Sequence, residues 1–222
     1  MNVFDIIGPV MIGPSSSHTA GAVRLGRVVN KLSDGRIPAR VEITLSGSFA
    51  QTYKGHGTDR ALLAGIMGYH SYSPEIRDAL MIADKKGMQY SFIKENIRDA
   101  HPNTASIKYY TEDGAEGTVQ GASVGGGNIK VDHINGMRVS FSGDKNTLLV
   151  MHEDKPGVIA SVTNIMHWQY EDLNIAGFRL SRQAKGGEAI MTIEIDGNPP
   201  DTLIEDLRKL KYISNAILIR KL

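Results

Sequence analysis

The chain has 222 residues, enough for two small domains, and its 41% hydrophobic and 22% charged residues are typical of a folded protein rather than a disordered or fibrous one. Its 25 basic and 24 acidic residues leave a formal net charge of +1, which argues against an overall field able to hold a nucleic acid. The absence of cysteine excludes disulfides and a thiolate-ligated metal centre built from this chain alone. Asp5, Gly8 and Pro9 interrupt the apolar N-terminus, so neither a signal peptide nor a membrane span is expected, and the predicted location is the cytoplasm.

The N-terminal half predicts helices and one strand before residue 88. Apolar residues recur at helical spacing after Ser15, Ser16 and Ser17, which predicts a helix that starts near His18 with a serine cap. Further along we expect a strand over Arg40–Leu45, a glycine-rich loop over 46–57, a helix capped by Thr58 or Asp59, and a helix from Ser73 to about Gly87.

From Gln89 the pattern changes to alternating strands, and Asn135-Gly136 between Ile129–Ile134 and Met137–Phe141 is typical of a two-residue hairpin. The segment 142–147 has no apolar residue and several turn formers, so it predicts a linker. We therefore expect an N-terminal α/β domain over 1–142 and a second domain over 147–222.

The second domain predicts the order strand, helix, strand, strand, helix, strand. The expected ranges are Leu148–His152, Pro156–Gln169, Leu173–Ser181, Ala189–Ile195, Pro200–Lys211 and Ile213–Arg220. This βαββαβ order is that of the ferredoxin-like unit, in which two helices cover one face of an antiparallel sheet. The whole chain is accordingly expected to be an α+β protein.

Two polar clusters could bind a small acid. Ser15, Ser16, Ser17, His18 and Thr19 surround a helix start, where hydroxyls and free amides can hold a carboxylate or phosphate and His18 can act as acid or base. The alternative is an ordinary capped helix.

The second cluster joins Gly47 and Ser48 to a histidine between glycines, His56, followed by Thr58 and Asp59. Its alternative is a flexible turn that caps a helix. A third loop, Gly125–Asn128 after Ser123, is interpreted as a bulge or wide turn. None of these segments matches a phosphate loop or a dinucleotide fingerprint, which argues against nucleotide binding.

Asp154-Lys155-Pro156-Gly157 joins the first strand of the second domain to its helix. Amides near Gly157 could receive the carboxylate of an amino acid while Asp154 meets its ammonium group. The alternative is a strand-to-helix turn with an acidic cap.

The motifs GPSSSHTAG, SGSFAQTYKGHGTDRA and SVGGGN together resemble the beta subunit of the iron-sulfur-dependent L-serine dehydratases. The segment HEDKPGVIASV, with the βαββαβ order, resembles an ACT domain, a small regulatory module that often binds amino acids. The resemblance covers essentially the whole chain.

The resemblance implies a lyase that converts L-serine to pyruvate and ammonia without pyridoxal phosphate. It implies a [4Fe-4S] cluster held by a partner alpha subunit, no metal ligand in this chain, and for some relatives a monovalent cation. It also implies inactivity without the alpha subunit, and the exposed face of an ACT sheet makes self-association an expectation.

The resemblance also implies roles for individual residues. His18 and His56 are the candidates for proton transfer, with the choice between them open, and Asp154 and Gly157 are the candidates for an effector. The implied substrate-binding residues are Ser15, Ser16, Ser17, Thr19, Gly47, Ser48, Thr58, Asp59 and Asn128. Hydroxyls and helix amides would hold the carboxylate of serine and Asp59 its ammonium group.

The N-terminal domain also resembles the allosteric substrate-binding domain found beside ACT domains in some phosphoglycerate dehydrogenases. That domain senses an effector and catalyses nothing. The alternative function is therefore a serine-sensing regulatory subunit without catalytic residues.

Overall fold

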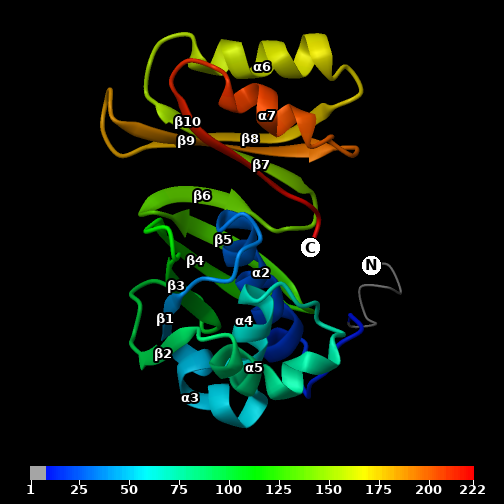
Figure 1. The fold of residues 1–222 in the computed structure, drawn as a ribbon, viewed down its shortest axis with the longest axis vertical. Coiled ribbons are helices and arrows are strands. Elements are labelled where there is room, and N and C mark those ends of the chain that lie inside the picture. The colour runs from blue at the N-terminus through cyan, green and yellow to red at the C-terminus, as the bar shows by residue number, and fades with distance from the viewer. Residues whose placement is uncertain (1–8) are drawn as a thin grey trace. The chain divides into compact units, whose positions relative to one another are not determined.

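The computed structural model describes residues 9–222, and the chain divides into two compact units, residues 1–135 and 136–222 (Figure 1). This division falls in a hairpin that precedes the expected linker at 142–147, and the domain bounds 1–142 and 147–222 stay a prediction. Most of the apolar N-terminal segment, over which no signal peptide or span is expected, lies outside the described residues. Over residues 9–222, no helix has the length and apolar character needed to cross a membrane.

The first sheet has six strands in the order β2-β1-β3-β4-β5-β6. They are β1 (Arg40–Leu45), β2 (Gln89–Lys94), β3 (Thr104–Tyr110), β4 (Glu116–Gly125), β5 (Asn128–Ile134) and β6 (Met137–Phe141). β1 pairs parallel with β2, and the pairs β1–β3, β3–β4 and β4–β5 are antiparallel. The predicted hairpin is confirmed, because Asn135 and Gly136 have φ of 51° and 74°, as a type I′ turn requires.

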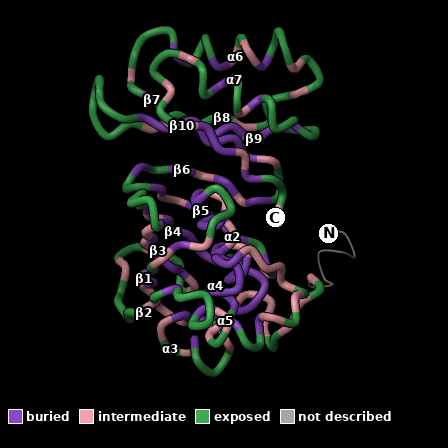
Figure 2. Tube along the Cα trace, viewed as in Figure 1, coloured by how far each residue is buried: buried purple, intermediate pink, exposed green. Residues whose placement is uncertain are grey.

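The helical segments that accompany this sheet in the described part of the chain are η1 (Ser17–Gly21), α2 (Ala22–Leu32), α3 (Gly47–His56), α4 (Thr58–Ile66), η2 (Pro74–Asp78) and α5 (Ala79–Lys85). α2 and α4 are almost wholly buried (Figure 2). They cross where Gly26 meets Gly65, and a Cβ at Gly65 would lie 2.1 Å from the carbonyl oxygen of Val23. Glycine is needed at this crossing because the two backbones touch.

The expected loop over 46–57 is wrong, because residues 47–56 form the helix α3. Phe49 and Tyr53 are both buried, and their spacing of four residues puts them on one helix face. The glycines delimit this helix instead of breaking it. Gly47 has φ of +56°, and Gly57 ends the helix with φ of +70°, as is common at helix C-termini.

Two details of the helix starts also differ from expectation. α4 follows α3 directly, so its N-cap is Gly57 and neither Thr58 nor Asp59 caps it. The helix expected near His18 is confirmed, but its first turn is a π-helix, in which the Gly21 amide donates to the Ser16 carbonyl.

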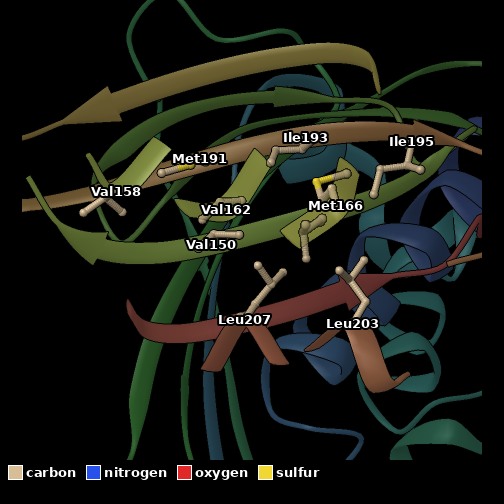
Figure 3. Close-up of a cluster of buried hydrophobic side chains, with 11 residues drawn as sticks. Val150, Val158, Val162, Met166, Met191, Ile193, Ile195, Leu203 and Leu207 are labelled. Atoms are coloured by element: carbon tan, nitrogen blue, oxygen red, sulfur yellow. The ribbon is translucent and has the colours of Figure 1, made fainter. Parts of the chain in front are cut away.

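The second unit confirms the predicted βαββαβ order and the α+β class. Its elements are β7 (Asn146–Glu153), α6 (Val158–Gln169), β8 (Asn174–Arg182), β9 (Glu188–Asp196), α7 (Thr202–Arg208) and β10 (Ile213–Ile219). The sheet order is β10-β7-β9-β8, with every pair antiparallel. Its core lies between the sheet and the two helices, where Val162, Met166 and Leu207 meet Val150 and Ile193 (Figure 3).

Candidate active site

His18 is the centre of a hydrogen-bond network that joins two distant motifs. Its Nδ1 lies 3.3 Å from Ser15 Oγ, and its Nε2 lies 3.3 Å from Ser48 Oγ and 3.1 Å from Thr52 Oγ1. The side chains come from the start of η1 and from the helix α3. The GPSSSHTAG and SGSFAQTYKGHGTDRA segments therefore meet at His18.

The partners of Thr52 indicate which nitrogen of His18 carries the proton. The Thr52 hydroxyl donates its single hydrogen to the Ser48 carbonyl at 2.8 Å, so Thr52 Oγ1 accepts from His18 and Nε2 is protonated. Nδ1 is then the basic atom, and it faces Ser15. The Ser15 oxygen also accepts from the His18 amide at 3.4 Å, which leaves its hydroxyl hydrogen free to donate to Nδ1.

His18 is held in its neutral form. Its residue is 8% exposed, and burial, followed by the charge of His56, lowers the pKa of the imidazole below 6.5. Both effects disfavour the charged ring. A neutral imidazole with one basic nitrogen can accept a proton.

His56 lies beside His18, with their ring centroids 4.6 Å apart in an edge contact. His56 is exposed at the end of α3 and lines a cavity of about 480 Å³. The lining residues are Met11, Ile12, Gly13, Pro14, Thr19, Lys54, Gly55, His56, Gly57, Arg60, Ile76 and Arg77. His18 is not in this lining, so His56 is the imidazole that a ligand in the cavity would touch.

Three of the helix amides expected to receive a carboxylate, those of His18, Thr19 and Gly21, are already bonded. The His18 amide donates to Ser15 Oγ, the Thr19 amide to the Ser15 carbonyl, and the Gly21 amide to the Ser16 carbonyl. The π-turn bonds the Gly21 amide to the Ser16 carbonyl five residues earlier. An acid in the cavity would therefore not be bound by these three amides.

Asp59 and Thr58, which begin α4, are both buried and lie outside the lining of the cavity. Burial raises the pKa of Asp59, and its Oδ1 accepts from the Arg60 amide at 2.8 Å. Thr58 Oγ1 has no hydrogen-bond partner among the described residues. Whether Asp59 meets an ammonium group stays a prediction.

Gly47 and Asn128 have structural partners. A Cβ at Gly47 would lie 2.5 Å from the Pro102 carbonyl oxygen, so this glycine permits a close approach of two backbone segments. The Asn128 side-chain oxygen accepts from Arg24 at 3.4 Å, and the Gly127 carbonyl accepts from Arg24 at 3.0 Å. Neither Gly47 nor Asn128 lines the cavity.

Four residues of this region were not among the site residues predicted from the sequence: Thr52, Lys54, Arg60 and Arg77. The position of Thr52, four residues after Ser48, becomes informative only once α3 is known to be helical. Lys54 and Arg60 lie within the second motif and Arg77 lies outside it, and their meeting at one cavity depends on how α3, α4 and η2 pack.

In the second unit, Asp154 is bonded to the last residue of β8 and to the loop between β8 and β9. Its Oδ2 accepts from Arg182 Nη1 at 2.6 Å and from the Gly186 amide at 2.9 Å. These two bonds, that of Gly186 first, lower the pKa of Asp154. Gly157 is the N-cap of α6, with φ of +88°. A strand-to-helix turn is thus present, but its cap is Gly157 and not the acidic residue of the alternative interpretation. An effector role for the pair stays a prediction.

Comparison with known proteins identifies the family. Residues 2–153 match the family model described as serine dehydratase beta chain. The probable L-serine dehydratase beta chain of Bacillus subtilis is 45% identical over 96% of this chain and 94% of its own length, and the L-serine dehydratase beta chain of Peptoniphilus asaccharolyticus is 37% identical over 96% and 97%.

Two further likenesses cover parts of other proteins. A D-3-phosphoglycerate dehydrogenase of Synechocystis is 25% identical over 90% of this chain but over 35% of its own length. The ACT domain of a GTP pyrophosphokinase of Chlorobium tepidum is 25% identical over 33% of this chain and 94% of that domain, with a TM-score of 0.28. The family match and the two beta-chain relatives show that the chain belongs to the serine dehydratase beta chain family.

Proposed function

We propose that this chain is the beta subunit of a [4Fe-4S]-dependent L-serine ammonia-lyase, which forms pyruvate and ammonia together with a cluster-bearing alpha subunit. The observation that carries the proposal is the meeting of two motifs at one site. Ser15 and His18 from the first motif meet Ser48 and His56 from the second beside a cavity large enough for a small amino acid.

The residues of this chain do not fit an iron-sulfur cluster. The sequence has no cysteine, and residues 9–222 contain no group of three His, Asp or Glu side chains placed to hold a metal. The proposal therefore assigns the cluster to the alpha subunit and derives no step through it. It includes no pyridoxal phosphate, and it leaves a monovalent cation to be tested by assay in potassium and sodium.

The roles that we propose for this chain are binding and proton transfer. Loss of water from serine requires removal of the proton on the α-carbon. His56 lines the cavity and is the candidate for this step, while His18, neutral and anchored by Ser15 and Thr52, would position the His56 ring through their edge contact.

The test is anaerobic reconstitution with an alpha chain that carries a cluster. Pyruvate formation is expected with both chains and not with this chain alone. His56→Ala should abolish turnover in an assembled complex, and His18→Ala should lower it, whereas His167→Ala, which removes an exposed histidine of the second unit, is the matched control. Full activity of the alpha chain without this subunit would overturn the proposal.

The similarity to D-3-phosphoglycerate dehydrogenase over 90% of this chain supports a second candidate function, a serine-sensing subunit that catalyses nothing. In that case the same residues bind serine only to change the conformation of a partner. Normal pyruvate formation by both histidine variants, with loss of the response to serine, would favour the sensor.

For the second unit we propose an ACT-type regulatory role, with an effector at Asp154 and Gly157 and self-association through the sheet. The support is the βαββαβ order and the position of Gly157 at the start of α6. Sedimentation of the full chain with and without serine tests the association. An Asp154→Ala variant with an unchanged serine response would remove the effector role.

A further inference from the structure

Among residues 9–222, the lining of the cavity beside His56 includes basic side chains and no acidic one. Lys54, Arg60 and Arg77 reach it from three different elements. None of the three forms an ion pair with another residue in the described part of the chain. Like charges gathered without a counter-charge repel one another, and an anion bound between them removes that repulsion.

Asp59 acts on two of these cations but makes no ion pair with them among the described residues. It interacts with Arg60 and Lys54 across space, while burial raises its pKa and its Oδ1 accepts from the Arg60 amide. Lys54 otherwise lies over the ring of Tyr53, with Nζ 5.9 Å from the ring centroid. The positive charge of the cavity is thus available to a ligand.

A buried hydroxyl at the wall of the cavity also lacks a partner. Thr19 is 1% exposed and its Oγ1 makes no hydrogen bond with the described residues. Gly13 lies directly against it, since a Cβ at position 13 would come within 2.2 Å of Thr19 Oγ1. Any side chain at position 13 would clash with this hydroxyl, and both residues line the cavity.

We infer that Lys54, Arg60, Arg77 and the Thr19 hydroxyl form the binding site for the carboxylate of a small amino acid. Guanidinium groups bind carboxylates through paired hydrogen bonds, and the hydroxyl can add another. The amides of His18, Thr19 and Gly21, which are already bonded to Ser15 and Ser16, do not take this role. The identification of the amino acid as L-serine rests on the proposed function. A carboxylate bound at this site would place the other groups of L-serine beside His56.

The test is calorimetric titration of the full-length chain with L-serine, with L-serinamide, which lacks the carboxylate, and with inorganic phosphate. L-serine is expected to bind and L-serinamide not to bind. Arg60→Gln and Arg77→Gln should each weaken serine binding by at least about tenfold, the effect of one lost charge-assisted hydrogen bond. Arg98→Gln, which removes a guanidinium whose side chain is 94% exposed, should leave the affinity unchanged.

The imidazole protons in NMR spectra provide a second readout, because a carboxylate held at this site should raise the pKa of His18. Equal affinity for serine and serinamide, no serine binding, or serine binding unaffected by both arginine variants would overturn the inference. Binding of phosphate without serine would overturn the carboxylate assignment. Reconstituted pyruvate formation tests the proposed function separately, so failure of one is distinguishable from failure of the other.

Discussion

Replacement of Thr19 by valine should stabilise the protein while it weakens ligand binding. Valine has nearly the same shape as threonine, and the two have similar helix propensities. The Thr19 hydroxyl is buried and unpartnered in the described structure, and such a group costs about 1–3 kcal/mol. Removing it should therefore increase the free energy of unfolding by about 1 kcal/mol.

For a chain of this size, 1 kcal/mol corresponds to a rise in Tm of about 2–4 °C. Thermal unfolding measures this shift, and calorimetry with L-serine measures the expected loss of affinity. The matched control is Thr192→Val in β9, because Thr192 is also buried with an unpartnered Oγ1. This variant should gain similar stability and keep its serine affinity.

A Tm that falls in the Thr19→Val protein would refute the reasoning, because it would mean that the hydroxyl has a stabilising partner in the free protein. An unchanged serine affinity together with a raised Tm would show that the unpartnered hydroxyl is not part of the binding site. The comparison therefore separates the cost of burial from the contribution to binding.

Three further predictions concern pH, packing and the second unit. Burial lowers the pKa of His18 in the folded protein below 6.5, so the unfolded chain binds more protons than the folded one as the pH drops below 6.5. The free energy of unfolding should therefore fall as the pH drops from about 6.5. Urea unfolding at several pH values should show a weaker pH dependence for His18→Gln than for the unchanged protein. Gly65→Ala places a Cβ against the backbone of α2 and should lower the free energy of unfolding in urea by about 1–3 kcal/mol. Its control is Gly55→Ala, whose Cβ meets no atom within 4 Å and should stabilise α3 by up to about 1 kcal/mol. Equal effects of the two variants would contradict the described crossing of α2 and α4. Asp154→Ala should speed hydrogen exchange of the Gly186 amide, which donates to the lost carboxylate, and unchanged exchange would disprove that bond.

Local patterns were sufficient for most of the secondary structure. The strand over 40–45, the Asn135-Gly136 hairpin and the βαββαβ order of the second unit were predicted because alternation, helical spacing and turn residues act within a few neighbours. The same local rules failed at 46–57. There the glycines suggested a loop, but Phe49 and Tyr53 anchor a helix by packing into a core that the local sequence does not reveal.

The sequence by itself also determined which motifs carry the candidate chemistry, since the serines, His18 and His56 stand in recognisable segments. Only the tertiary structure decided how they are used. The folded structure sets His18 against His56, bonds three helix amides to serine oxygens, and gathers three basic side chains from different elements at one cavity. Distances between residues remote in the chain depend on the packing of whole helices, and no local pattern of residues encodes them.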